Sequence, residues 1–374
     1  MQPKDKLLIV TNLYPLPWQP TRATFNFQQF GYLEEHCQVS YLIPVAFPDW
    51  WANRKQLPTD QSKIRYVPYF YLPKFGRRFY GKLMQWSLSL FAGHWIRSTR
   101  ANKVLGSWAY PDGVASQAIA SKLNADFYLK VHGSDINMHA QYPERASQIT
   151  RIANASQGVL SVSQDLADKM IKLGINENKI RTIYNGVNLE KFITSEAETA
   201  DPYIVFVGNL KKEKGVLELL EGFGQIASKY ADISLRYVGS GPMLSVLKAK
   251  VKQLNLGNRV VFEGVKAHDE LPEIIARATI LSLPSYNEGV PNVVLESMAC
   301  STPVVATAVG GIPEVVTEET GIIVPEISAC SVAKGLSEAL DKEWDSKSIR
   351  KHAESFSWAK NTSLTLNLLK IKEK

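Results

Sequence analysis

The segment Ile280–Ala306, ILSLPSYNEGVPNVVLESMACSTPVVA, constrains the fold of this chain more than any other stretch. Its apolar start, Ile280–Leu283, is typical of a buried strand, and Val304–Ala306 is typical of a second one. Between the two, Pro291 can occupy the first position of a helix through Asn292–Ala299, because that position needs no backbone N–H. The segment therefore predicts a strand–loop–helix–strand unit of a parallel sheet.

Two carboxylates lie near the start of this predicted helix. Glu288 stands in the loop before it. Glu296 is five residues past Pro291 and so lies roughly 7 Å along the helix axis from it, at about 1.5 Å per residue. A helix N-terminus offers unpaired N–H groups and a partial positive charge, which suit a diphosphate. A nucleotide bound there would reach one carboxylate with its ribose and the other with its sugar. The spacing alone also fits two solvated glutamates.

The residues around these glutamates are more specific. Residues 285–314, SYNEGVPNVVLESMACSTPVVATAVGGIPE, resemble the donor site of the GT-B glycosyltransferases of family 4 almost position by position. The resemblance implies that Glu296 binds the ribose hydroxyls and that Glu288 orients the transferred sugar. It implies that backbone near Val265 reads the base. It also implies that the diphosphate binds the N–H groups of Gly289, Val290, Asn292 and Val293.

A second loop, residues 208–215 (GNLKKEKG), resembles the family's phosphate-binding loop. That loop normally holds the diphosphate with an Arg after its first glycine and a Lys before its second. Lys214 matches the Lys and is expected to stabilise the leaving diphosphate, but Asn209 stands at the Arg position. Lys211 and Lys212 are the candidates to compensate.

His132 begins the tetrapeptide HGSD directly after the predicted strand Phe127–Val131. In open parallel sheets, ligands bind at the carboxyl ends of the strands. A single histidine is more often structural, but HGSD resembles the family's active-site histidine. The resemblance implies that His132 reaches from the first domain to the transferred sugar, and it places Asp135 on the acceptor side.

Residues 14–30, YPLPWQPTRATFNFQQF, resemble the family's first loop, which normally carries a glycine close to the donor phosphates. Ala23 stands in the place of that glycine, so we expect the backbone there to do without a positive φ. Arg22, Ala23 and Thr24 are the candidate contacts of this loop. The alternative is an ordinary surface loop with Trp18 packed down.

The length of 374 residues favours two domains. With the resemblance, we expect a GT-B arrangement of two Rossmann-like parallel-sheet domains that face across a ligand-binding cleft. Residues 1–190 are the expected acceptor-side domain, joined by a final helix at about 358–374 that crosses back. Residues 203–357 are the expected donor domain, and the small, acidic segment Thr194–Pro202 is the expected linker.

The charge is uneven, since residues 1–190 carry a net charge of +9 and the remainder −2. This indicates an anionic partner for the first half. No nucleic-acid-binding motif is present, so a bilayer surface is favoured over nucleic acid. In Phe75–Lys103, apolar residues recur at helical spacing between basic ends, which fits an anionic membrane surface. The alternative is a core helix with a basic flank. The apolar residues are Phe79, Leu83, Trp86, Leu90 and Phe91.

The sequence predicts neither a metal site nor a cofactor. The three cysteines are scattered and form no C-x-x-C pair, which indicates a reducing compartment without a zinc site. The D-x-D motif of metal-dependent glycosyltransferases is absent from the sequence. The N-terminus has too short an apolar core for a signal peptide. We therefore expect a cytoplasmic protein at the inner face of a membrane.

Together these features predict a hexosyltransferase-type glycosyltransferase that uses a nucleotide-diphosphate sugar, UDP-linked by preference. The expected acceptor is a lipid-linked glycan or polysaccharide of the cell envelope, and the resemblance implies retention of anomeric configuration. One alternative is a UDP-sugar isomerase of similar shape. The other is a degenerate, membrane-associated scaffold, for which Ala23 and Asn209 are the motive.

Overall fold

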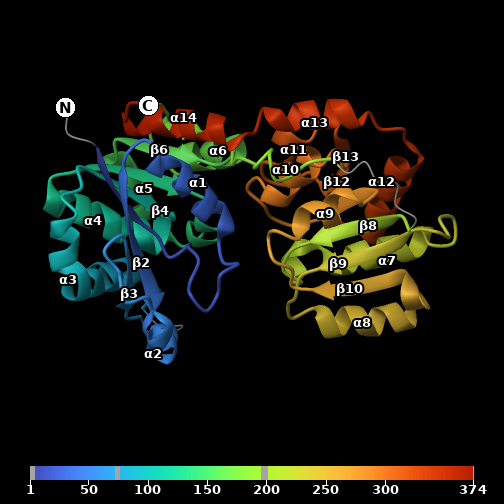
Figure 1. Cartoon of the computed structure of the whole chain (residues 1–374), viewed down its shortest axis with the longest axis horizontal. Coiled ribbons are helices and arrows are strands. Elements are labelled where there is room, and N and C mark those ends of the chain that lie inside the picture. The colour runs from blue at the N-terminus through green and yellow to red at the C-terminus, as the bar shows by residue number, and fades with distance from the viewer. Residues whose placement is uncertain (1–4, 72–75, 195–200, 374) are drawn as a thin grey trace. The chain divides into compact units, whose positions relative to one another are not determined.

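The structure is a computed structural model that describes residues 5–71, 76–194 and 201–373. It divides into two compact units, Met1–Tyr184 with Ala359–Lys374, and Asn185–Trp358. Each unit has a parallel β-sheet covered by helices (Figure 1), which is the α/β class expected from the sequence. Residues 185–190, assigned above to the first domain, group with the second unit. Of the expected linker, residues 195–200 lie outside the described residues.

The sheet of the first unit has the strand order β3-β2-β1-β4-β5-β6-β7, which reverses direction between β1 and β4. Its strands are β1 (Lys6–Val10), β2 (Gln38–Ala46), β3 (Ile64–Tyr69), β4 (Lys103–Ser107), β5 (Asp126–Val131), β6 (Gly158–Ser161) and β7 (Ile180–Thr182). Its helices are α1 (Thr24–Glu34), α2 (Phe47–Asn53), α3 (Tyr80–Ser98), α4 (Val114–Leu123), α5 (Pro143–Ala155), α6 (Gln164–Lys172) and α14 (Trp358–Leu369).

Alternation along the strands gives this unit a hydrophobic core on each face of its sheet. In β1, Leu8 and Val10 point into one core and Leu7 and Ile9 into the other, as the period of two dictates. The first core is closed by α3, α4, α5 and α6, and the second by α1 and α14. A buried hydrogen bond from Gln29 Nε2 to Asn361 Oδ1 (2.8 Å) ties α14 to α1. The end of the chain thus completes the first unit.

The second unit repeats the design with the strand order β10-β9-β8-β11-β12-β13, reversing between β8 and β11. Its strands are β8 (Tyr203–Val207), β9 (Ser234–Val238), β10 (Val260–Gly264), β11 (Ile280–Leu283), β12 (Val304–Thr307) and β13 (Gly321–Val324). Its helices are α7 (Val216–Ile226), α8 (Leu244–Gln253), α9 (Leu271–Ala276), α10 (Asn292–Ala299), α11 (Ile312–Val315), α12 (Ala329–Asp341) and α13 (Ser346–Glu354).

The strand–loop–helix–strand unit predicted for residues 280–306 is confirmed as β11, α10 and β12. One detail was wrong. Pro291 has an extended backbone (φ −69°, ψ 127°) and caps α10, so that Asn292 is the first helical residue. The N-cap residue lies outside the helical turn, and its carbonyl accepts from Val294 N at 3.1 Å.

The conformation expected for Ala23 was also wrong. Ala23 has φ 48° and ψ 43°, the left-handed region that the sequence analysis excluded for a residue with a Cβ. The turn is held on both sides, because Arg22 Nη2 donates to Asn12 O (2.9 Å) and Asn26 Nδ2 donates to Leu13 O (2.9 Å). The position therefore has a backbone conformation that favours glycine, although alanine stands there.

We expect Ala23→Gly to raise the free energy of unfolding by about 0.5–1 kcal/mol. Glycine adopts the left-handed conformation without a steric cost and is a better N-cap than alanine. Ala52→Gly, at an exposed site inside α2, is the control and should lower stability by about as much. Urea unfolding of the three proteins measures both effects. A destabilised Ala23→Gly protein would mean that Ala23 carries no strain.

The helix expected over Phe75–Lys103 is α3, but its expected apolar stripe does not face the core. Trp86 and Leu90 are 58% and 59% exposed. The core is instead contacted by Met84, Leu88, Ala92 and Ile96. The alternative, a core helix with a basic flank, is therefore confirmed for α3 itself, but the residues that face the core are not those of the expected stripe. Phe75 lies outside the described residues, and among the residues described no helix has the length and hydropathy to cross a membrane.

Candidate nucleotide-sugar site

The loops that follow β8 and β11 meet at the point where the strand order of the second unit reverses. Gly215 ends the first loop with φ 63°, and a Cβ there would lie 1.9 Å from Pro284 O in the second loop. Only glycine permits this approach of two backbones. In open parallel sheets, such reversal points at the carboxyl ends of strands are where ligands bind.

Lys214 and Glu288 form an ion pair across these two loops. Lys214 Nζ lies 2.5 Å from Glu288 Oε1, and the same oxygen accepts from Ser285 Oγ at 2.7 Å. The Lys214 side chain is 31% exposed and that of Glu288 is 10% exposed. The carboxylate therefore fixes the position of the cation while leaving it open to solvent. Because an ammonium carries three N–H donors, the ion pair leaves donors for an anion.

A third loop, after β12, supports the backbone of Glu288. Gly310 has φ 56°, and a Cβ there would lie 2.1 Å from Glu288 O. Gly311 N donates to Gly289 O at 2.7 Å. The two glycines of the motif VGG, Gly310 and Gly311, thus contact the backbone of the loop that carries Glu288.

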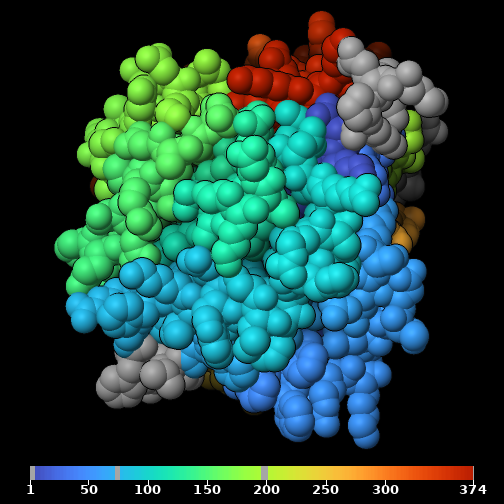
Figure 2. Space-filling view, turned by 90° about the vertical axis from the view of Figure 1, so that its left-hand side faces the viewer, coloured from blue at the N-terminus to red at the C-terminus, as the bar shows by residue number. Residues whose placement is uncertain are grey.

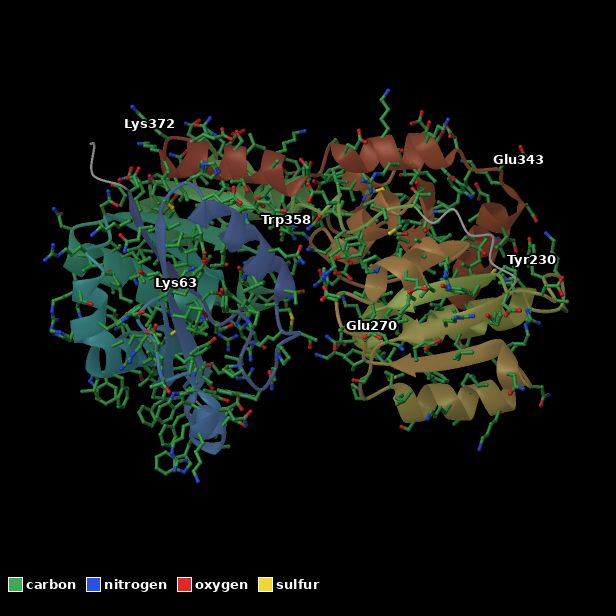
Figure 3. All side chains as sticks on the ribbon, in the orientation of Figure 1. Lys63, Tyr230, Glu270, Glu343, Trp358 and Lys372 are labelled. Atoms are coloured by element: carbon green, nitrogen blue, oxygen red, sulfur yellow. The ribbon has the colours of Figure 1, made fainter. Side chains whose placement is uncertain are left out.

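Glu296 lies on α10, and the structure gives it a partner that the sequence analysis missed. Its Oε1 is 3.0 Å from His268 Nε2, and His268 Nδ1 is 2.7 Å from Lys191 Nζ. A lysine ammonium only donates, so Nδ1 accepts and the Nε2 proton points at Glu296. Lys191 and His268 therefore orient the carboxylate. His268 follows the predicted base-reading residue Val265 by three positions, which was the available signal. Figure 3 labels Glu270, two residues further along.

In the first unit, His132 follows β5 and lies beside the end of β4. Ser107 Oγ, the last residue of β4, is 2.8 Å from His132 Nε2. The ring of Phe25 lies 5.4 Å from the imidazole, centroid to centroid. Ser107 was not predicted, although its place at the carboxyl end of a strand next to β5 is the expected one for a functional side chain.

Asp135 shapes the turn that carries His132. Its carboxylate is buried and accepts from the backbone N–H groups of His132 (3.0 Å), Gly133 (2.9 Å) and Ala109 (3.0 Å). Burial raises the pKa of this carboxyl, and the amide hydrogen bonds oppose the rise. In this geometry Asp135 positions His132 and does not present its carboxylate to an acceptor.

Lys130 is a buried cation two residues before His132. Its Nζ donates to Asn26 Oδ1 (3.1 Å) and to Gln29 Oε1. Burial lowers the pKa of Lys130 to about 7. Burial, and next the charge of Lys130, lower the pKa of His132 well below 6.5. The imidazole is therefore neutral at physiological pH. A lysine inside the apolar strand FYLKV was the signal for this residue, which the sequence analysis did not use.

The first loop is fixed to the same end of the sheet. Asp112 is buried and accepts from Asn12 N at 2.5 Å and Asn12 Nδ2 at 3.0 Å. Burial raises the pKa of Asp112 to about 8. Arg22 holds the carbonyl of the same Asn12, and Thr24 begins α1. Since β1, β4 and β5 are neighbours, the structure brings this loop and His132 to one edge of the sheet.

Two family models match consecutive parts of this chain. The family model described as Glycosyltransferase Family 4 matches residues 45–191, and that described as Glycosyl transferases group 1 matches residues 188–356. The chain is a glycosyltransferase. The range matched by the group 1 model includes Lys214, Glu288 and Glu296, and the range matched by the Family 4 model includes His132.

Individual relatives of this glycosyltransferase are distant. The putative teichuronic acid biosynthesis glycosyltransferase TuaC of Bacillus subtilis is 25% identical, over 88% of either chain. The putative colanic acid biosynthesis glycosyltransferase WcaL of Escherichia coli is 28% identical, over 55% of this chain and 53% of its own. The structure of Anabaena HepE with UDP and glucose has a TM-score of 0.74 at 18% identity, covering 98% and 99% of the chains. The fold is therefore GT-B.

The remaining predicted donor residues of the glycosyltransferase lie in the same unit as Lys214. Asn209 and Val265 are exposed, and Asn292 Oδ1 accepts from Asn185 Nδ2 at 2.9 Å. Gly289 and Val293 are partly exposed, whereas the side chain of Val290 is buried. Within residues 5–71, 76–194 and 201–373, no group of three His, Cys, Asp or Glu side chains is arranged to hold a metal ion.

Proposed function

We propose that this glycosyltransferase moves a sugar from a UDP-sugar to a lipid-linked glycan or polysaccharide of the bacterial envelope, with retention of anomeric configuration, at the cytoplasmic face of a membrane. The names of the relatives TuaC and WcaL support the biosynthetic role. The UDP and glucose in the HepE structure support the donor class. The observation that carries the proposal is the Lys214–Glu288 pair at the strand reversal of the second unit, with Glu296 on the helix that follows.

The proposed chemistry follows from the charges that develop during transfer. The anomeric carbon becomes positive, and the departing diphosphate gains negative charge. Lys214 and the N–H groups of Gly289, Val290, Asn292 and Val293 bind that diphosphate in our proposal, in place of a divalent metal. The Glu296 carboxylate accepts hydrogen bonds from the ribose hydroxyls. The Glu288 carboxylate pairs with Lys214 and accepts hydrogen bonds from the hydroxyls of the transferred sugar.

His132 is proposed to hydrogen-bond the transferred sugar as a neutral imidazole. The lowered pKa supports this, because a neutral ring adds no positive charge beside a carbon that is itself becoming positive. Arg22, Ala23 and Thr24 are proposed to line the acceptor side with their loop, which Asp112 anchors.

The test is calorimetric titration of UDP, GDP and ADP in EDTA. We expect UDP to bind best, and Glu296→Ala to weaken UDP by roughly 10- to 150-fold, because the ribose loses charged hydrogen bonds of about 1.5–3 kcal/mol. Glu338→Ala removes an exposed glutamate of α12 and serves as the control, with unchanged affinity expected. His268→Ala should lower the UDP affinity about fivefold, because Glu296 remains but loses the imidazole that orients its carboxylate.

Binding of a different nucleotide would correct the donor base, and loss of binding in EDTA would overturn the metal-free site. An affinity unaffected by Glu296→Ala would remove that residue from the site. Product analysis with UDP-sugars then tests the activity. Free UDP together with a glycosylated acceptor supports the transferase, a new UDP-sugar would show the isomerase, and no product from any donor would support the scaffold.

A further inference from the structure

Aromatic rings on α2, the end of β3 and α3 contact one another in a series, in which Phe47 and Phe70 are half-buried and Trp51 and Phe91 are exposed. Ring centroids lie 6.0 Å apart for Phe47 and Trp51, 4.6 Å for Phe47 and Phe70, and 5.9 Å for Phe70 and Phe91. Phe70 N donates to Ser87 Oγ (3.1 Å), which fixes the end of β3 against α3. We call this the aromatic surface. Its members are Phe47, Trp51, Phe70, Trp86, Leu90 and Phe91.

Figure 2 looks onto the first unit and shows the blue-to-cyan residues of this region along the lower part of that face. In Figure 3, ring side chains gather beside α2. Trp51, Trp86, Leu90 and Phe91 are all exposed. Four large apolar side chains gathered in one region of a soluble unit indicate a binding surface.

The same region carries the whole charge excess of the first half of the chain. Residues 46–103 hold 11 Lys and Arg against 2 Asp and Glu, whereas the rest of residues 1–190 holds 11 of each. Arg54 stacks on Trp51 at 3.8 Å and Arg78 on Phe79 at 4.8 Å. Lys82 is exposed on α3, one turn before Trp86. Apolar rings are thus bordered by cations.

The aromatic surface lies at the same edge of the sheet as His132. α2 follows β2, Phe70 follows β3, and His132 follows β5, and all these strands are parallel. Their carboxyl ends therefore share one edge. In the order β3-β2-β1-β4-β5, four strand spacings separate β3 from β5, or roughly 19 Å.

We infer that the aromatic surface docks the first unit on an anionic phospholipid bilayer, with the rings in the interface and the cations at the headgroups. Aromatic and apolar side chains ringed by Lys and Arg match the depth profile of such an interface. A second copy of this chain would face the surface with equal positive charge, which opposes pairing through this face. This inference rests on the proposed function for its purpose, since a membrane-held acceptor chain then reaches the edge that carries His132.

The test is co-sedimentation of the full chain with phosphatidylcholine vesicles, with and without phosphatidylglycerol. We expect binding to the anionic vesicles only. Trp86→Ser combined with Leu90→Ser should reduce binding at least tenfold, because two large side chains no longer enter the interface. Arg78→Ser and Lys82→Ser should each reduce it roughly fivefold.

The matched control combines Ile171→Ser on α6 with Val246→Ser on α8, both exposed apolar residues outside the aromatic surface. This control should bind vesicles like the wild type. Equal binding to neutral vesicles, or an undiminished affinity of the Trp86→Ser/Leu90→Ser protein, would overturn the inference. So would a wild-type dimer, measured by sedimentation without vesicles, that the Trp86→Ser/Leu90→Ser change dissociates.

UDP titration of the same variants separates this inference from the proposed function. None of the substituted residues belongs to the second-unit site, so their UDP affinity should equal that of the wild type. Vesicle binding without UDP binding would leave the docking surface standing and remove the UDP-sugar donor. UDP binding without vesicle binding would leave the UDP-sugar donor standing and overturn the docking surface.

Discussion

Lys214→Ala is expected to lower kcat by about 100- to 1,000-fold with a UDP-sugar donor. Removal of one preorganised group from a developing negative charge typically has this effect. Lys214 is the cation that the structure fixes at the strand reversal, through its 2.5 Å contact with Glu288. Because Asn209 replaces the family's Arg, this site depends on Lys214 more than a site with two fixed cations would. Initial-rate measurement of UDP release checks the prediction.

Lys212→Ala is the matched control, since Lys212 belongs to the same short helical turn and is exposed. We expect less than a threefold change for it. An equal loss in both variants would assign the diphosphate to the overall charge of the loop, with Lys211 and Lys212 sharing the role. A Lys214→Ala enzyme within tenfold of wild type would remove Lys214 from the diphosphate site.

The sequence predicted the elements whose determinants are contiguous. The run from β11 through α10 to β12 holds its apolar strands, its small-residue loop and its proline within 28 residues, so its periodicity sufficed. The same holds for the positions of the two glutamates, Glu288 in the loop before α10 and Glu296 on that helix, because one contiguous stretch carries both. Only the cap position of Pro291 was misplaced, a matter of one residue at a helix end.

The contacts that the sequence analysis missed join residues that are far apart in the chain. His268 meets Glu296 across 28 positions, and Lys191 meets His268 across 77. Ser107 and His132 are separated by 25 positions and meet only because β4 and β5 pair. A single sequence records each of these residues without recording the pairing, so the tertiary fold alone reveals them.

Ala23 and α3 show a different reason. The rule that a residue with a Cβ avoids positive φ was applied correctly, yet the hydrogen bonds of Arg22 and Asn26 override it locally. On α3, Phe79, Leu83, Trp86, Leu90 and Phe91 were taken as one stripe, but the core is contacted by Met84, Leu88, Ala92 and Ile96. A helix with apolar residues on two faces has no unique core face by periodicity.

His132→Ala is expected to lower kcat by about 100- to 1,000-fold while UDP affinity stays unchanged. The reason is that His132 belongs to the first unit, whereas the proposed UDP contacts are all in the second. Ser107→Ala removes the hydroxyl that lies 2.8 Å from His132 Nε2. We expect it to lower kcat about tenfold, because the imidazole of His132 remains but is less firmly oriented. Initial rates together with UDP titration of each variant measure both effects.

The pH dependence of stability checks the protonation state on which this role depends. In the unfolded chain, a histidine takes up a proton as the pH falls through about 6.5, whereas His132 in the folded protein does not, because its pKa is lowered. The free energy of unfolding should therefore fall by about 1 kcal/mol between pH 7.5 and 5.5 through this group. The His132→Ala protein should lack that part of the decrease. His139→Ala is the control for the catalytic effect, because His139 ends the short helical segment Asp135–His139 that follows His132, and its Nδ1 lies 3.1 Å from Arg145 Nη1. A His132→Ala enzyme with undiminished kcat would make the histidine structural, and an equal loss in His139→Ala would trace the effect to the turn as a whole.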